Sequence, residues 1–192
     1  MSKRASLLIK IGLLLTAAAL CLAAYNLYEG VKAGNAAADA AAKIDAFIEE
    51  SGEACVFDPD MEMPTVQLDG YEYIGILRIQ ALSLELPVMS EWSYSALKIA
   101  PCRYAGSAYS GDLVIAAHNY SSHFGRIKGL SSGDELSFTD ANGNVFYYTV
   151  AEVETLSPFA TEEMTSSGWD LTLFTCTVGG ASRVTVRCEK VE

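Results

Sequence analysis

Residues 171–188 read LTLFTCTVGGASRVTVRC, which is two runs of β-forming residues separated by a glycine-rich turn. Alternating residue character with a period of two is typical of strands, and a pair of glycines favours a tight turn between them. Pairing the two strands about this turn places Cys176 directly opposite Arg183. Cys188 then lies on the face opposite to Arg183, and we interpret it as a core residue.

Further strands are predicted upstream of this hairpin, where short β-type runs alternate with turn residues. They are 73–79, 82–88, 112–118, 135–140 and 144–156. Asn142-Gly143 predicts a hairpin between the last two. One short helix is expected near 93–99 and a helical turn near 125–130. Seven or eight strands in about 120 residues predict a mostly β fold, either a closed barrel or a sandwich.

The composition limits the classes of function. With 51% hydrophobic and 19% charged residues in 192, disorder over most of the chain is excluded. Residues 1–25 hold three basic residues and no acid, so residues 26–192 carry 10 basic and 24 acidic residues, a net charge of −14. Such a domain is repelled by phosphate backbones. Since P-loop, GxGxxG and zinc-type Cys/His spacings are absent, we expect no nucleic-acid partner, no metal and no cofactor.

The N-terminal region predicts a membrane segment. Residues 11–25 read IGLLLTAAALCLAAY, and only Thr16 interrupts the apolar run. With the apolar residues that precede it, the segment reaches about 19 residues, or roughly 30 Å of helix. Lys3, Arg4 and Lys10 lie near its start, so the positive-inside rule predicts a cytoplasmic N-terminus. A single-pass signal anchor in the cell membrane is favoured over a cleaved signal peptide, and either one places the main domain outside the cell.

Three regions are therefore expected along the chain. Residues 1–28 form the cytoplasmic tail and anchor, 29–70 a helical stalk followed by an extended linker, and 71–192 the β domain. Apolar residues of the alanine-rich stalk recur at helical spacing, and Gly30 and Gly34 are the positions at which the helix would break. The linker contains two prolines and a run of charges.

Three side chains form a candidate catalytic site. A guanidinium at Arg183 favours the thiolate of Cys176 and donates hydrogen bonds to an oxyanion. His118 ends an apolar strand, and its imidazole can protonate a leaving amine. His123 lies in the next loop and is interpreted as a surface or packing residue. Arg187 lies four residues beyond Arg183, roughly 13 Å along the strand and too far to act on the same atom.

The same residues resemble a known family. TLFTC at 172–176, followed by Arg183, is similar to the TLxTC…R signature of sortases. DLVIAAHNY, which contains His118, and the following HFGRIKGLSSGDELSF resemble the histidine strand of sortases and the loop and strand after it. YIGILRI and LELPV resemble the opening strands, so the match covers about residues 71–191. Ala117 departs from the pattern, because a glycine often precedes the histidine in this family.

The resemblance implies a closed eight-stranded sortase-type β-barrel with one or two short helices, preceded by the membrane helix and stalk. It also implies a cysteine transpeptidase of the Gram-positive cell surface that cleaves an LPxTG-type sorting signal. In that role Cys176 forms a thioacyl intermediate, His118 is general acid and then base, Arg183 steadies substrate and oxyanion, and Thr175 contributes to substrate binding. The acceptor is an amine of a peptidoglycan precursor or of a pilin. The subclass is class B-like or class D-like.

Other interpretations remain. L,D-transpeptidases carry an SxGC element that is absent around Cys176, and papain-like enzymes place their cysteine at the start of a helix. The non-enzymatic alternative is a membrane-tethered β-barrel used in adhesion or surface assembly, with Cys176 in the core and His118 structural. In an exported chain, a disulfide between Cys55 and Cys102 is a further hypothesis.

Overall fold

The computed structural model describes residues 3–51, 58–165 and 168–191. Its helices are α1 (Lys3–Ser51) and α2 (Thr161–Thr165), with 3-10 turns η1 (Gln80–Leu82), η2 (Ala96–Lys98) and η3 (Phe124–Gly129). Its strands are β1 (Val66–Leu68), β2 (Tyr71–Ile79), β3 (Leu84–Met89), β4 (Cys102–Ala105), β5 (Leu113–Ala117), β6 (Glu135–Asp140), β7 (Val145–Leu156), β8 (Leu171–Cys176) and β9 (Arg183–Lys190).

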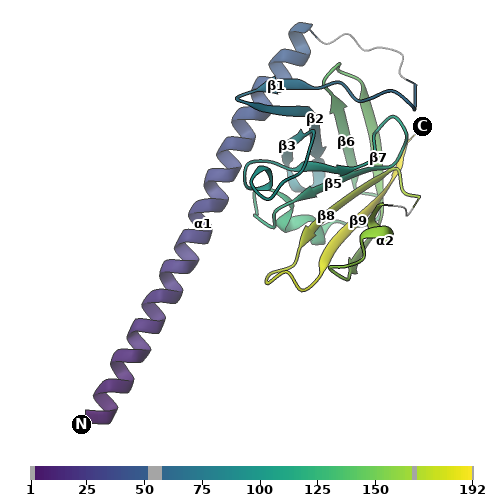
Figure 1. Ribbon diagram of the computed structural model, residues 1–192. Coiled ribbons are helices and arrows are strands. Elements are labelled where there is room, and N and C mark those ends of the chain that lie inside the picture. The colour runs from purple at the N-terminus through teal and green to yellow at the C-terminus, as the bar shows by residue number, and fades with distance from the viewer. Residues whose placement is uncertain (1–2, 52–57, 166–167, 192) are drawn as a thin grey trace. The chain divides into compact units, whose positions relative to one another are not determined.

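Strands β2 to β9 close into a barrel, and β1 adds to one edge of β2 (Figure 1). The order is β1-β2-β3-β4-β5-β8-β9-β7-β6, and a second pairing of β2 with β6 closes it. The β3–β4 and β5–β8 pairs are parallel and the other pairs are antiparallel. The predicted eight-stranded barrel is therefore confirmed, with α2 and the 3-10 turns as its short helical elements.

One glycine allows the barrel to close. β1 pairs with the first residues of β2, whereas β6 pairs with the residues from Gly75 onward. Gly75 has a φ of +149°, and a Cβ there would overlap the carbonyl oxygen of Thr139 on β6. Any larger residue would push β6 away, so a glycine is required where β2 exchanges one neighbour for the other.

The barrel interior is apolar because alternate residues of each strand point inward. Its fully buried side chains include Leu77, Ile79, Leu113, Ile115, Phe138, Leu171, Leu173, Val186 and Cys188. Cys188 is thus a core residue, as the strand pattern predicted, and burial raises the pKa of its thiol to about 12. The hairpin predicted at Asn142-Gly143 joins β6 and β7, with Gly143 at a φ of +85°.

The chain divides into two compact units, Met1–Lys32 and Ala33–Glu192, and α1 contributes to both. In the first unit, α1 carries an 18-residue window of mean hydropathy 2.3 with none of it buried. A helix of this length and apolarity is sufficient to cross a membrane. Neither Gly30 nor Gly34 interrupts α1, so the break that the sequence allowed does not occur.

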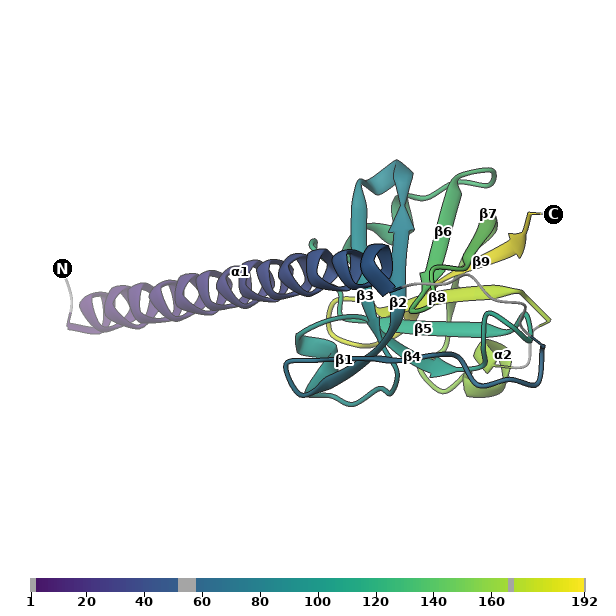
Figure 2. The same cartoon turned by 90° about the horizontal axis from the view of Figure 1, so that it is seen from above.

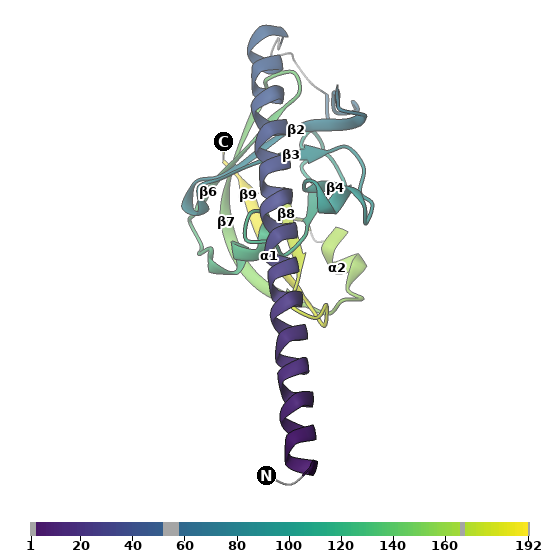
Figure 3. The same ribbon diagram turned by 90° about the vertical axis from the view of Figure 1, so that its left-hand side faces the viewer.

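The second part of α1 packs on the barrel. Ala40 and Ile44 are buried in one apolar cluster with Tyr73 and Ile76 of β2 and Met89 of β3. Figure 3 shows this part of the helix passing across β2 and β3. Residues 33–51, which the sequence suggested as part of a stalk, therefore belong to the same compact unit as the barrel.

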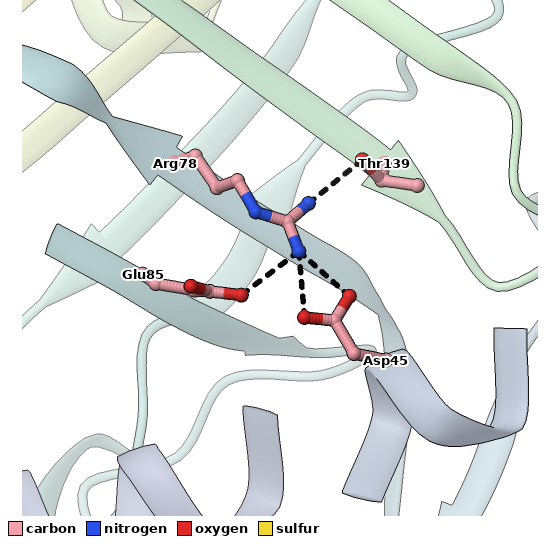
Figure 4. A network of polar contacts seen from close by, with 4 residues as sticks. All are labelled: Asp45, Arg78, Glu85 and Thr139. Carbon is pink, nitrogen blue, oxygen red and sulfur yellow. Dashed lines mark hydrogen bonds and ion pairs between the residues drawn. The ribbon is translucent and has the colours of Figure 1, made fainter. Parts of the chain in front are cut away.

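A polar network fixes α1 to the barrel surface (Figure 4). Nη2 of Arg78 donates to both carboxylate oxygens of Asp45 at 2.6 and 2.7 Å and to Glu85 at 2.8 Å, while Nη1 donates to Thr139 at 3.2 Å. Burial opposes ionisation of Asp45, but the hydrogen bonds outweigh it and the pKa of Asp45 is lowered. The ionised carboxylate of α1 is therefore held by a cation of β2.

Two short strands were not predicted. β1 lies in the segment expected to be an extended linker, and β4 follows η2 in a stretch without a clear alternating pattern. Both are at most four residues long, which is too short for a reliable period-two signal. Cys102 of β4 is a buried free thiol, and Cys55, its hypothetical disulfide partner, lies outside the described residues.

Candidate active site

Cys176 is the last residue of β8, and its side chain lies on the outer side of the barrel wall. Leu171 and Leu173 of the same strand belong to the barrel core. Because successive side chains of a strand point to opposite faces, Cys176 points to the face opposite to Leu171 and Leu173. Its thiol is partly exposed. The register pairs Cys176 with Arg183, the first residue of β9, as the sequence predicted.

His118 and Cys176 leave the sheet side by side. Figure 2 shows β5 and β8 running beside one another. Their last paired residues are Ala117 and Thr175, and the residues that follow these in the sequence are His118 and Cys176. Oγ1 of Thr175 donates to the carbonyl oxygen of Ala117 at 2.8 Å, so it ties the two strands together immediately before the site. The side chain of Thr175 is only 3% exposed. Its hydroxyl is therefore occupied in joining the strands that carry the histidine and the cysteine.

Arg183 is half-buried, and its guanidinium is turned toward the β8–β9 connection. Nη1 donates to the carbonyl oxygens of Gly180 and Ser182, both at 3.2 Å. Among the described residues it makes no hydrogen bond to Cys176. The two residues are nonetheless direct cross-strand partners, and side chains at paired positions lie within reach of one another.

The surroundings of His118 favour the neutral form of its imidazole. Burial lowers its pKa below the ordinary value, and the positive charge of Lys98 on η2 adds to this effect. The ring also lies against that of Tyr120, with 5.1 Å between centroids. A neutral imidazole can accept a proton from a neighbouring thiol. Lys98 and Tyr120 were not identified from the sequence, because neither position has a recognisable spacing relative to His118.

His123, the other histidine, is a packing residue rather than a surface residue. It is fully buried, and burial lowers the pKa of its imidazole to about 4. The carbonyl of Ala33 on α1 opposes this shift, and the neighbouring His118 reinforces it whenever its own imidazole is protonated. Neither ring nitrogen of His123 has a hydrogen-bond partner of good geometry among the described residues.

The buried His123 is expected to make the protein less stable in acid. In the unfolded chain His123 binds a proton near pH 6.5, whereas in the folded chain it does so only near pH 4. The free energy of unfolding is therefore unaffected by this group above pH 6.5 and decreases as the pH falls below it. Between pH 7.5 and 5 this group alone costs about 2 kcal/mol. His123→Phe should remove that part of the loss, as measured by urea unfolding of both proteins in detergent at the two pH values. Equal pH dependence of the two proteins would contradict this expectation.

Arg187 lies on the same strand as Arg183 and has a different environment. It is 2% exposed. Its Nε donates to Glu154 of β7 at 2.7 Å, its Nη1 to Thr172 of β8 at 3.1 Å, and its Nη2 to the carbonyl of Glu163 on α2 at 2.8 Å. Arg187 therefore joins three elements to β9 and is separated from the candidate site, as its spacing predicted.

A buried apolar cluster lies beside the candidate site on the outer side of the barrel. Phe174, two residues before Cys176, clusters with Val114 and Ala116 of β5 and with Met164 of α2. The ring of Tyr104 meets that of Phe174 edge-on at 5.2 Å between centroids. All four residues of the cluster are at most 8% exposed, so the cluster packs α2 against β5 and β8 beside the candidate site.

The comparisons with known proteins identify the family of the chain. The Sortase domain family matches residues 77–191, which is more than half of the chain and includes all three candidate catalytic residues. The chain belongs to the sortase family. Sortase A of Bacillus anthracis is 31% identical over 125 residues, and this match covers 62% of the chain and 59% of that relative. The chain thus matches somewhat more than half the length of this sortase.

Solved sortase structures share the fold. Sortase A from Corynebacterium diphtheriae superimposes with a TM-score of 0.58 at 16% identity, covering 89% of this chain and 95% of the other. Sortase C from Streptococcus pneumoniae gives a TM-score of 0.57 at 22% identity, covering 86% and 89%. At such identities the likeness describes the barrel and does not assign this sortase to a subclass.

Proposed function

We propose that this sortase is a membrane-anchored cysteine transpeptidase that cleaves an LPxTG-type sorting signal and transfers the surface protein to a cell-wall amine. The observation that carries the proposal is the meeting of Cys176, His118 and Arg183 at the adjoining ends of β8, β5 and β9. Membership of the sortase family supports the same assignment.

In the proposed reaction, His118 accepts the proton of the Cys176 thiol, and the thiolate attacks the threonine carbonyl carbon of the signal. Arg183 donates hydrogen bonds to the oxyanion that forms. The carbon–nitrogen bond breaks as His118 gives its proton to the leaving amine, and a thioacyl enzyme results. An acceptor amine then attacks the thioester, neutral His118 takes its proton, and Cys176 is released. Thr175 acts as a positioning residue by joining β5 to β8.

The location follows from α1 and its flanking charges. The apolar window of α1 is proposed to span the cell membrane once, with the three basic residues before residue 11 on the cytoplasmic side. The barrel then lies outside the cell, where sorting signals and an amine of a peptidoglycan precursor or pilin are available. We propose no nucleic-acid partner, because the acidic balance of the chain opposes one.

The experiment that tests the proposal uses the full chain in detergent with a panel of LPxTG-type and NPxTN-type peptides. Triglycine serves as the acceptor, and the products are followed by mass spectrometry. The expected result is cleavage after threonine and a triglycine-linked product, with a thioacyl adduct on Cys176 when the acceptor is withheld. An unmodified Cys176 with no turnover, combined with no reaction toward methanethiosulfonate, would favour the non-catalytic adhesion barrel instead.

A further inference from the structure

The loop after His118 is a tight turn with little freedom of its own. The carbonyl of Tyr120 accepts hydrogen bonds from the amides of His123 and Gly125, at 3.0 and 2.8 Å, and the amide of Phe124 donates to the carbonyl of His118 at 3.2 Å. Phe124 is fully buried in the core. A displacement of this loop therefore moves the backbone that carries His118.

Aromatic rings extend this connection to the imidazole itself. The ring of Tyr120 lies between those of His118 and His123, with centroids 5.1 and 5.6 Å away. His123 is fully buried and makes no use of its ring nitrogens in hydrogen bonds of good geometry among the described residues. The His123 imidazole takes no part in the proposed acyl transfer. Its contribution is to pack between the loop and α1.

One turn of α1 presses on this loop. Ala33 and Ala37 are buried at 3% and 1% exposure, and the carbonyl of Ala33 faces His123. Between them stands Gly34, where an added Cβ would lie 2.7 Å from Cβ of Ser122 and 3.1 Å from its hydroxyl. Glycine is a poorer helix former than alanine, so Gly34 destabilises the interior of α1. Because it has no side chain, it also allows the helix backbone to approach the loop closely.

The helix cannot easily yield at this contact, because its next turns are fixed to the barrel. Nζ of Lys43 bonds Asp69 at 3.0 Å in the β1–β2 turn, and Asp45 is held by both of its carboxylate oxygens to Arg78 (Figure 4). An added side chain at position 34 would therefore displace the loop rather than the helix.

We propose that Gly34 of α1 is a positioning residue for His118, acting through Ser122 and the Tyr120–His123 ring contacts. The inference rests on the proposed acyl transfer and names a part of the chain, before the barrel begins, that the reaction needs. The close helix–loop contact sets where the imidazole stands relative to Cys176. The position of His118 therefore depends on α1, the same helix that carries the apolar N-terminal window.

The test is Gly34→Ala in the full chain in detergent. We expect kcat for transfer to fall about tenfold with KM within twofold of wild type, because a misplaced proton-transfer group slows chemistry without weakening binding. The melting temperature should stay level or rise, since alanine favours the helix. The second variant, Gly34→Ala with Ser122→Gly, removes the clashing Cβ and should recover most of the lost kcat. Gly12→Ala makes the same change in α1 where nothing lies within 4 Å and serves as the matched control.

A second measurement keeps the inference independent of turnover. The chain has only two histidines, so the imidazole Cε1–H region of a carbon–proton NMR spectrum shows two signals, which His123→Phe assigns. Gly34→Ala is expected to shift the His118 signal, and the Ser122→Gly change to return it. An unmoved His118 signal, a wild-type kcat in Gly34→Ala, or a loss of kcat that Ser122→Gly leaves uncorrected would each overturn the inference. An inactive wild-type chain would overturn only the proposed function, because the His118 signal would still report the contact.

Discussion

Cys176→Ala is expected to lower the rates of peptide cleavage and of transfer to triglycine by about 10⁴-fold or more. The proposed reaction passes through a thioester on this sulfur, so the variant loses the covalent route and keeps only binding and oxyanion contacts. Initial rates measured by chromatography and mass spectrometry, with wild-type enzyme at matched concentration, give the ratio. The variant should still fold, because the thiol is partly exposed and stands outside the barrel core.

Cys102→Ala is the control for this variant. Burial raises the pKa of the Cys102 thiol to about 12, and the residue packs in a different cluster from the candidate site. Turnover should therefore stay within a fewfold of wild type, and methanethiosulfonate should label Cys176 well before Cys102 in the native protein. Cleavage by Cys176→Ala at more than about a hundredth of the wild-type rate would rule out Cys176 as the proposed nucleophile.

The local geometry of the site was accessible from the sequence. The β8–β9 hairpin is a contact between neighbours in the chain, so its turn and its period-two alternation were enough to pair Cys176 with Arg183. The same pattern placed Cys188 in the core and Arg187 away from the candidate site. These predictions depended only on residues within a single hairpin.

The approach of His118 to Cys176 required the structure. β5 and β8 are parallel strands separated by more than fifty residues of chain, and no spacing rule relates two such strands. The residue types made His118 a candidate partner of Cys176 and the family resemblance favoured the pair, but no spacing in the sequence brought the two residues together. The hydrogen bond of Thr175 to the Ala117 carbonyl was likewise not predictable from the sequence, because it depends on the pairing of the two strands.

The packing of α1 was also beyond the sequence pattern. Ala40, Ala41, Ile44, Phe47 and Ile48 recur at helical spacing and predict a helix with one apolar face. Such a face is equally suited to a stalk that meets another chain and to a helix that covers its own barrel. On the side of β2 and β3 that α1 covers, the apolar residues Tyr73, Ile76 and Met89 are followed or preceded by the charged residues Arg78 and Glu85. This mixed character did not mark the face as one that a helix covers.

The two arginines of β9 are expected to respond in opposite ways. Arg183→Ala should lower kcat/KM by about 10²- to 10³-fold, because it removes the proposed oxyanion donor. Its melting temperature should change little, since the side chain is half-buried and its hydrogen bonds go to turn carbonyls. Arg183→Lys should recover only part of the activity, because an ammonium keeps the charge and loses the planar fork of donors.

Arg187→Ala should instead cost about 3–5 kcal/mol of folding stability, because it leaves the Glu154 carboxylate and the Thr172 hydroxyl without their buried cation. Urea unfolding and thermal melting of both variants in detergent measure the stability, and peptide cleavage at a temperature where both remain folded measures activity. The folded fraction of Arg187→Ala should cleave peptide at a rate near that of wild type. A stable but inactive Arg187→Ala beside an active Arg183→Ala would reverse the assignment, because the catalytic cation would then lie four residues further along β9 than the cross-strand partner of Cys176.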